Sequence, residues 1–340
     1  MTSARSGRRV LLAALSIALA GGPLRAAAAT VVAQGRPATL HVPPSYVPSI
    51  PTPLVILLHG YGSSSTAQEA YMQFTPLADE FGFLYLTPDG KVDCLGNQFW
   101  NATDACCNFC GSADDSGYLK ALIEATATGF NVDRLRVFLI GHSNGGFMAY
   151  RMACDHPRLI AAIASLAGAT YADPTKCGFQ GPVHVLQLHG TADATILFGG
   201  GAINGVVYPG AIATVEDWAT RNGCSPVADT SAAPRDLEAN LPGSESTVTR
   251  YATGCFAGGS AELWTIVGGQ HVPALSSTFS RQVVEFLMAH PKPAGALVPT
   301  LQPGMQRLLP VALLAVFLVA YRRLRRGRSS QPRASRPRST

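Results

Sequence analysis

Residues 141–146, Gly-His-Ser-Asn-Gly-Gly, could hold a reactive serine at the apex of a tight turn. The apolar run 137–140 precedes them, and a segment compatible with a helix, 147–154, follows. A serine between a strand and a helix holds its hydroxyl clear of the sheet, and the backbone N–H of the next residue can face a developing oxyanion. Small residues alone occur in many ordinary turns, so the strand–turn–helix context carries the prediction. We predict Ser143 as a nucleophile and the N–H of Asn144 as an oxyanion donor.

A serine hydroxyl is a poor nucleophile at neutral pH, so it needs a histidine to accept its proton and usually a carboxylate to orient that histidine. When the serine lies on a strand–helix turn, the acid and then the histidine follow it in the chain, each at the carboxyl end of a strand. This order selects His271, in a glycine-flanked loop after the last predicted strand. The preferred acid is Asp193, shortly after the predicted strand 183–188. The less well placed alternatives are Asp155, Asp173 and Asp217.

The turn after the predicted strand 54–58 should supply a second oxyanion donor. Its sequence at 59–63 is His-Gly-Tyr-Gly-Ser, and the two glycines permit a sharp turn and a close approach of the backbone. We expect the backbone N–H of Tyr61 to be this donor. His142, beside the serine, is interpreted as a packing residue.

Three aromatic residues near the predicted rim loops, Phe99, Trp100 and Phe109, could line a substrate pocket. Aromatic side chains are as often part of a core, so both interpretations stay open. Asp114 and Asp115 could suggest a metal site or a carboxylate pair, but they directly precede a predicted helix, where capping explains them more simply.

Between residues 30 and 290, short apolar runs alternate with helix-length segments. This pattern predicts a single α/β catalytic domain with a mostly parallel central sheet and helices on both faces. The predicted strands are 54–58, 83–86, 137–140, 160–166, 183–188 and 262–267, and the predicted helices are 66–79, 115–129, 147–154 and 276–289. The intervening loop 92–114 is long and rich in cysteine, which makes it a candidate binding loop.

The N-terminal residues 1–29 combine arginines, an apolar run and a cluster of alanines. This combination is typical of a secretory signal peptide, with cleavage near Ala29 or, alternatively, Ala20. We therefore expect a secreted, cell-surface or periplasmic protein.

The C-terminal end is built from a Pro/Gly-bearing linker at 291–307, a short apolar segment at 308–321 and an arginine-rich tail at 322–340. A membrane-spanning helix usually needs about 20 apolar residues, so the segment is short for a span. We interpret it as an anchor or sorting segment, the only part expected to contact a membrane. An amphipathic or disordered basic tail is the alternative.

The formal net charge of +5, from 26 basic and 21 acidic residues, comes from the two ends of the chain. Thirteen of the basic residues lie before residue 30 or from residue 307 onward, where there is no acidic residue. The body therefore has 13 basic against 21 acidic residues, a net charge of −8. The basic balance of the whole chain is no indication of nucleic-acid binding.

The even number of cysteines in a chain that we expect to be exported predicts disulfides. Proximity suggests Cys154 with Cys177 and Cys224 with Cys255, and leaves the pairing open among the remaining four, Cys94, Cys106, Cys107 and Cys110. The alternative for those four is a zinc site. Structural zinc sites usually pair two C-x-x-C clusters, and this chain has one, so we expect neither metal nor cofactor.

Several motifs resemble those of the secreted α/β-hydrolases that include poly(3-hydroxybutyrate) depolymerases and feruloyl or acetylxylan esterases. The matching residues are Leu57-Leu58-His59-Gly60, Trp100-Asn101-Ala102, Cys106-Cys107, Asp114-Asp115-Ser116-Gly117-Tyr118, the elbow 141–146, His189-Gly190-Thr191-Ala192-Asp193, Trp218 and Asn222-Gly223-Cys224. The resemblance implies an α/β-hydrolase fold and a triad of Ser143, Asp193 and His271. It further implies a small or oligomeric ester substrate, which could belong to a plant cell-wall polysaccharide or a polyester.

Two departures from that family bear on the substrate. Val272-Pro273 follows the histidine where family members often have Trp-Pro, and no separate polymer-binding domain is visible. Short soluble esters are therefore favoured over an insoluble polymer. Two other functions stay open: a catalytically silent surface-anchored binding module, and an acyltransferase or peptidase with the same triad.

Overall fold

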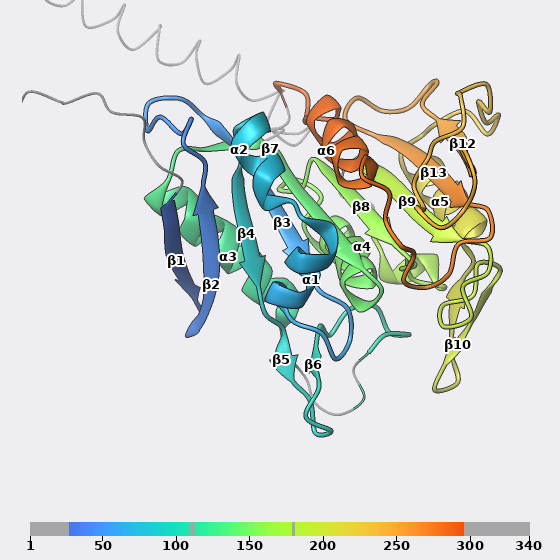
Figure 1. Ribbon diagram of the computed structural model, residues 1–340, viewed down its shortest axis with the longest axis horizontal. Coiled ribbons are helices and arrows are strands. Elements are labelled where there is room, and N and C mark those ends of the chain that lie inside the picture. The colour runs from blue at the N-terminus through green and yellow to red at the C-terminus, as the bar shows by residue number, and fades with distance from the viewer. Residues whose placement is uncertain (1–26, 108, 110–112, 179–180, 296–340) are drawn as a thin grey trace, which may run out of the picture. The chain divides into compact units, whose positions relative to one another are not determined.

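The computed structural model describes residues 27–107, 109, 113–178 and 181–295 (Figure 1). The elements below belong to one unit, which ends at Pro293.

A nine-stranded sheet forms the centre of this unit, in the order β1-β2-β4-β3-β7-β8-β9-β13-β12. The six strands from β4 to β13 in that order pair in parallel, and antiparallel strands flank them at both edges. The prediction of a mostly parallel sheet is therefore confirmed. The bounds are β1 (Ala27–Ala33), β2 (Arg36–Val42), β3 (Thr52–Leu58), β4 (Leu84–Pro88), β7 (Val132–His142), β8 (Ala162–Leu166), β9 (His184–Gly190), β12 (Ser246–Tyr251) and β13 (Ser260–Ile266).

Helices cover both faces of the sheet, as predicted (Figure 1). One face is packed by α3 (Asp115–Gly129), α4 (Asn144–Asp155) and α5 (Ala211–Arg221). The other face is packed by α1 (Ser65–Met72), α2 (Thr75–Phe81) and α6 (Phe279–Ala289). The side of each helix that faces the sheet contributes apolar side chains to the core on that face.

The burial of both faces explains the continuous apolar runs of the central strands. In β3, Leu54, Ile56 and Leu58 belong to the core on one face, while Val55 and Leu57 belong to the core on the other. Successive side chains of a strand point to opposite faces, so a strand covered on both sides needs apolar residues at every position.

The edge strands β1, β2 and β12 are not among the predicted strands, because the prediction followed continuous apolar runs and only some positions of each edge strand are buried. In β1, Val31 and Ala33 are buried, while Thr30 and Val32 are exposed. Two small hairpins were also missed: β5 (Lys91–Val92) with β6 (Gln98–Phe99), and β10 (Gly200–Ile203) with β11 (Val206–Pro209). A short 3₁₀ turn, η1 (Pro174–Lys176), completes the described elements.

The single helix predicted at 66–79 is wrong, because the structure has two helices there, α1 and α2. Gln73 ends α1 in the left-handed conformation, with φ 54°. The carboxylate of Glu69 then accepts the backbone N–H groups of Phe74 and Thr75. Pro76 lies in the first turn of α2, where its missing N–H costs nothing; inside one continuous helix it would break the hydrogen-bond ladder.

The folded unit extends slightly beyond both predicted boundaries. β1 begins at Ala27, three residues before the predicted mature start, although its buried residues all follow Thr30. At the other end Lys292 is buried, and its N–H donates to the carbonyl of Leu135, so the linker begins later than residue 291. No helix within the described ranges is long and apolar enough to cross a membrane. The segment 308–321, the tail 322–340 and residues 1–26 lie outside those ranges.

Disulfides join both of the pairs suggested by proximity, Cys154–Cys177 and Cys224–Cys255. Cys106 is bonded to its neighbour Cys107, so their sulfurs are not the thiolates that a zinc site would need. Cys94 is also disulfide-bonded. Cys110 lies outside the described residues.

Candidate active site

Ser143 lies at the strand-to-helix turn that its sequence predicts, between β7 and α4. Its backbone has φ 53° and ψ −120°, a conformation that costs a non-glycine residue free energy. The glycines around it are required by close packing, because a Cβ at Gly141 would lie 2.1 Å from the carbonyl oxygen of Gly145. A Cβ at Gly145 would lie 2.2 Å from the carbonyl oxygen of Leu58. The turn therefore packs closely against the end of β3, and Ser143 lies at its apex.

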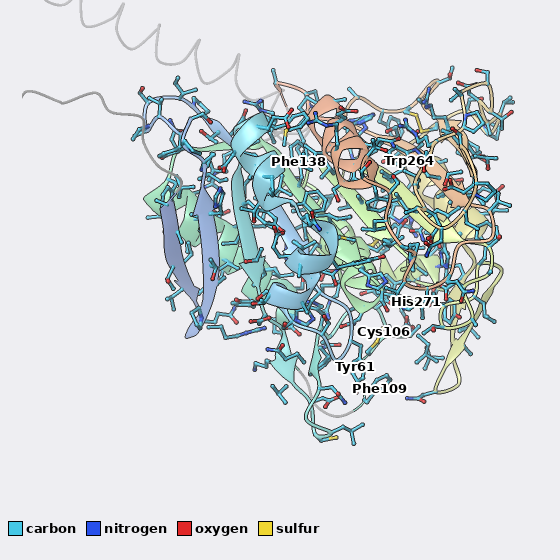
Figure 2. The ribbon with its side chains drawn as sticks, in the orientation of Figure 1. Tyr61, Cys106, Phe109, Phe138, Trp264 and His271 are labelled. Atoms are coloured by element: carbon cyan, nitrogen blue, oxygen red, sulfur yellow. A yellow bond between two sulfur atoms is a disulfide. The ribbon has the colours of Figure 1, made fainter. Side chains whose placement is uncertain are left out.

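The structure brings together the three predicted residues from three separate strand ends. Ser143 Oγ lies 3.0 Å from Nε2 of His271, and Nδ1 of His271 lies 2.8 Å from Oδ2 of Asp193. His271 follows β13, Asp193 follows β9, and Ser143 follows β7. Figure 2 shows His271 at the same end of the sheet as Tyr61, Cys106 and Phe109. These contacts have the geometry of a nucleophile, a base and an orienting acid.

Asp193 is held as a carboxylate by its own loop and by two histidines. Its Oδ1 accepts the backbone N–H groups of Thr195 (2.8 Å) and Ile196 (2.9 Å). Its Oδ2 faces both His271 and, at 3.3 Å, Nε2 of His189. Burial raises the pKa of Asp193, but the hydrogen bonds from His189 and His271 outweigh it and hold that pKa below its usual range.

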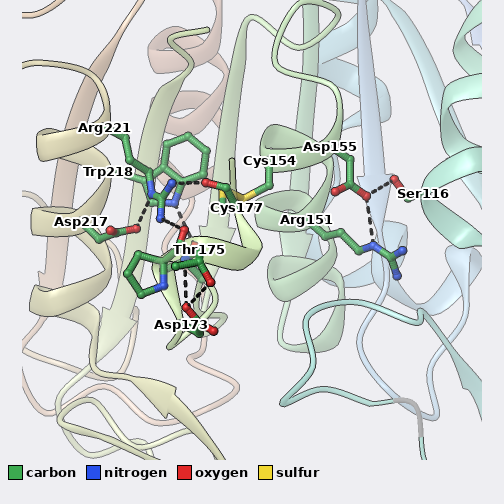
Figure 3. The surroundings of a disulfide bond; sticks show 12 residues. Ser116, Arg151, Cys154, Asp155, Asp173, Thr175, Cys177, Asp217, Trp218 and Arg221 are labelled. Carbon is green, nitrogen blue, oxygen red and sulfur yellow. Dashed lines mark hydrogen bonds and ion pairs between the residues drawn. A yellow bond between two sulfur atoms is a disulfide. The ribbon is translucent and has the colours of Figure 1, made fainter. Parts of the chain in front are cut away.

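The alternative acids have other partners, in the surroundings of the Cys154–Cys177 disulfide (Figure 3). Asp155 accepts hydrogen bonds from Ser116 and Arg151, Asp173 caps η1 through the N–H of Thr175, and Asp217 pairs with Arg221. Each contact is a local structural one, around the Cys154–Cys177 disulfide.

His142 does more than pack, which the sequence interpretation missed. Its Nε2 donates to the backbone carbonyl of His271 at 2.9 Å, and the two rings lie 5.2 Å apart. Burial lowers the pKa of His142 to about 4, so its imidazole is neutral at physiological pH. The sequence offered one signal: in a strand buried on both faces, a polar residue requires a hydrogen-bond partner.

The two expected oxyanion donors lie on the turns that flank Ser143. The N–H of Asn144 belongs to the first turn of α4, where backbone donors have no partner within the helix. The side-chain amide of Asn144 is held by the backbone of Trp100. Its oxygen accepts the backbone N–H of Trp100 (2.7 Å), and its NH₂ group donates to the backbone carbonyl of Trp100 (2.9 Å). The turn that carries Tyr61 is also adjacent, because a Cβ at Gly60 would lie 3.6 Å from Cβ of Ser143.

For the three aromatic residues both interpretations, pocket and core, were open, and their burial differs. Trp100 is fully buried and its indole N–H donates to the carbonyl of His59, and Phe99 is also buried, so both are core residues. Phe109 is 37% exposed and packs edge-on against Tyr61. Of the three, Phe109 alone has a side chain open to a substrate.

The two adjacent carboxylates at the start of α3, Asp114 and Asp115, have structural partners. Asp114 caps α3 through the N–H of Gly117 (2.8 Å), as expected. Asp115 is buried and pairs with Arg36 at 2.7 Å. The Cys106–Cys107 disulfide also contacts the residue after the serine, since the side-chain nitrogen of Asn144, Nδ2, lies 3.5 Å from Sγ of Cys106.

Comparison with known proteins shows the family of the chain. Residues 38–228, more than half of the chain, match the family described as Esterase PHB depolymerase; this range contains Ser143 and Asp193, and His271 follows it. The chain belongs to this family. It is 28% identical over 227 residues to feruloyl esterase B of Piromyces equi, covering 64% of this chain and 39% of that protein. It is 26% identical over 249 residues to feruloyl esterase D of Neurospora crassa, covering 69% and 73%.

A solved structure confirms the α/β-hydrolase fold of this family member. The acetyl xylan esterase from Aspergillus awamori superposes with a TM-score of 0.56 at 17% identity, covering 77% of this chain and 99% of that chain. The chain spans less than half the length of several curated relatives that it matches.

Proposed function

We propose that the protein is a serine carboxylic-ester hydrolase that works through an acyl-enzyme on Ser143. The observation that carries this proposal is the continuous contact from Ser143 Oγ to His271 (3.0 Å) and from His271 to Asp193 (2.8 Å). Membership of an esterase family supports it.

In this mechanism Ser143 Oγ attacks the ester carbonyl while Nε2 of His271 takes its proton. Asp193 holds the imidazole with its proton on Nδ1 and stabilises the imidazolium that forms. The backbone N–H groups of Asn144 and Tyr61 bind the oxyanion of the tetrahedral intermediate. His271 then gives its proton to the leaving alcohol. In the second half of the reaction His271 takes a proton from water, the water oxygen attacks the acyl-enzyme, and His271 returns the proton to Ser143 Oγ as the acid leaves.

The substrate class that fits best is a short-chain hydroxyacyl, feruloyl or acetyl ester. The relatives named above are feruloyl esterases, and the fold neighbour is an acetyl xylan esterase. Because Val272 replaces the tryptophan that often follows the histidine, we expect short soluble esters to be preferred. Kinetics with methyl ferulate, acetylated xylan and 3-hydroxybutyrate oligomers would rank the three acyl groups.

We further propose that the enzyme works outside the cytoplasm. The seven described cysteines are all disulfide-bonded, which is typical of an oxidising compartment. A signal peptide at 1–29 and an anchor or sorting segment at 308–321, both expected from the sequence alone, would account for export and retention.

Hydrolysis of p-nitrophenyl acetate and butyrate tests the proposed reaction. Wild-type protein should hydrolyse both esters, and Ser143→Ala should abolish the activity. Ser244→Ala, an exposed serine outside the site, is the matched control and should retain it. Equal activity in Ser143→Ala and wild type would overturn the proposal.

A further inference from the structure

Three buried side chains, those of Tyr150, Gln187 and His189, form a series of polar contacts that leads to Asp193. The hydroxyl of Tyr150 donates to Oε1 of Gln187 at 2.7 Å, and Nε2 of Gln187 lies 3.0 Å from Nδ1 of His189. Nε2 of His189 lies 3.3 Å from Oδ2 of Asp193, the same oxygen that faces His271. Tyr150, Gln187 and His189 are each no more than 1% exposed. A connected set of polar groups thus crosses the core to the acid of the site.

The direction of each hydrogen bond in this set is fixed by one backbone carbonyl. Nε2 of Gln187 also lies 2.8 Å from the carbonyl oxygen of Gly168, which can only accept. The amide group of Gln187 must therefore turn its NH₂ toward Gly168, and its second N–H points at Nδ1 of His189. Its oxygen is left to accept from Tyr150, as observed.

The orientation of Gln187 determines where the proton of His189 lies. Because Nδ1 accepts from Gln187, the neutral imidazole carries its proton on Nε2. That N–H faces two acceptors, the carbonyl of Ile196 at 2.7 Å and Oδ2 of Asp193 at 3.3 Å. The N–H of His189 thus donates to Ile196, and Oδ2 of Asp193 is its second, longer contact.

We propose that His189 is a positioning residue of the esterase site, a neutral Nε2–H donor that aims and holds the Asp193 carboxylate, with its tautomer set by Gln187. This inference rests on the proposed function. When His271 accepts the serine proton, the carboxylate already faces it and needs no reorientation. A fully connected buried network also resists rearrangement, since breaking one bond leaves a buried group unsatisfied.

A packing role would predict different behaviour. His189 lies edge-on to the ring of Phe198, with ring centroids 5.7 Å apart, so a replacement could lower stability through lost contacts alone. A packing defect changes the fraction of folded protein, but it leaves the pH dependence of the folded enzyme unchanged. The acid limb of the kcat/KM profile therefore separates the two roles.

The first experiment compares His189→Phe and His189→Gln, with active sites counted by fluorophosphonate titration. Phenylalanine keeps a ring without a donor, and we expect kcat to fall about tenfold, the equivalent of one hydrogen bond to a charged group, with KM little changed. The acid limb should move to higher pH, because the more basic carboxylate holds the proton of His271 more strongly. Glutamine places an N–H near the position of Nε2 and should restore both values toward wild type.

His184→Phe is the matched control, since His184 lies on the same strand but contacts Ser260 and His290 instead. Its acid limb should coincide with that of wild type. An acid limb of His189→Phe that coincides with wild type overturns the proposal, whatever the value of kcat. If wild type itself neither hydrolyses esters nor labels at Ser143, the proposed function fails rather than this inference.

A second measurement observes the wild-type protein directly and uses a variant only for assignment. Nitrogen-15 spectra of histidine-labelled wild type, assigned by comparison with His189→Gln, report the protonation of each ring nitrogen. From the hydrogen bonds around it we expect His189 to carry its proton on Nε2 and to have an unprotonated Nδ1 under the conditions of the activity assay. A proton on Nδ1 under those conditions contradicts the proposed role.

Discussion

At the scale of single residues, His271 is held at two points. Asp193 binds its ring at 2.8 Å, and His142 binds its backbone carbonyl at 2.9 Å. The second contact fixes the loop that presents the ring to Ser143. Since Ser143 immediately follows His142 in the chain, nucleophile and base are positioned by adjacent residues of one turn.

His142→Phe should therefore impair the reaction without unfolding the protein. The ring volume is nearly kept, but the carbonyl of His271 loses a donor worth about 1 kcal/mol, so kcat should fall about fivefold. His41→Phe, at a distant part of the sheet where His41 pairs with Asp79, is the control and should keep wild-type kcat. Wild-type kcat in His142→Phe would contradict this role.

Ser143 is predicted from its strand–turn–helix motif, and chain order together with the positions of strand ends then selects His271 and makes Asp193 the preferred acid. The roles of His142 and His189 were not predictable in the same way. His142 donates to a backbone carbonyl of the loop after β13, a contact that depends on tertiary packing. The donor and acceptor roles of His189 depend on Gln187, whose amide group is oriented by the backbone carbonyl of Gly168. For Trp100 the sequence leaves two interpretations open, a pocket residue or a core residue, and the structure shows that its side chain is buried.

At the scale of elements, the turn between β7 and α4 depends on how closely α4 approaches β3. Gly145 allows this approach, and a Cβ there would lie 2.2 Å from the carbonyl oxygen of Leu58. The helix N-terminus that carries the Asn144 donor is thus placed by contact between backbones. Sequence patterns predicted the turn, but not which strand it packs against.

Gly145→Ala should therefore lower both stability and activity. Relieving the overlap requires α4 to move, which should cost about 2 kcal/mol in the free energy of unfolding and displace the oxyanion donor. Gly129→Ala is the control, because a Cβ at that helix end meets nothing within 4 Å. Urea unfolding of both variants checks the difference, and equal unfolding midpoints would argue against the packing account.

At the scale of the whole molecule, two histidines are held in the neutral form, the buried His142 and the partly buried His184. Burial lowers the pKa of His142 to about 4 and that of His184 to about 3, whereas an unfolded chain has a histidine pKa near 6.5. Above about pH 6.5 neither state binds these protons, so stability does not depend on them. As pH falls from there toward 4, the unfolded state gains protons that the folded state does not accept.

The free energy of unfolding should therefore decrease between about pH 6.5 and pH 4, by about 3 kcal/mol from His142 alone. Asp193, whose pKa is held low in the folded state, changes stability in the same direction as pH falls below the usual range of a carboxyl. Urea unfolding at several pH values measures the slope, and His184→Phe should reduce it. Equal stability at pH 7 and pH 4.5 would contradict this prediction.

The central claim is that Ser143 is an activated nucleophile, and reaction with a fluorophosphonate tests it most directly. Mass spectrometry of labelled wild-type protein should show one adduct, on the peptide that contains Ser143. The adduct should be absent in Ser143→Ala and strongly reduced in His271→Ala. A wild-type protein without an adduct, or with one on another residue, would contradict the account.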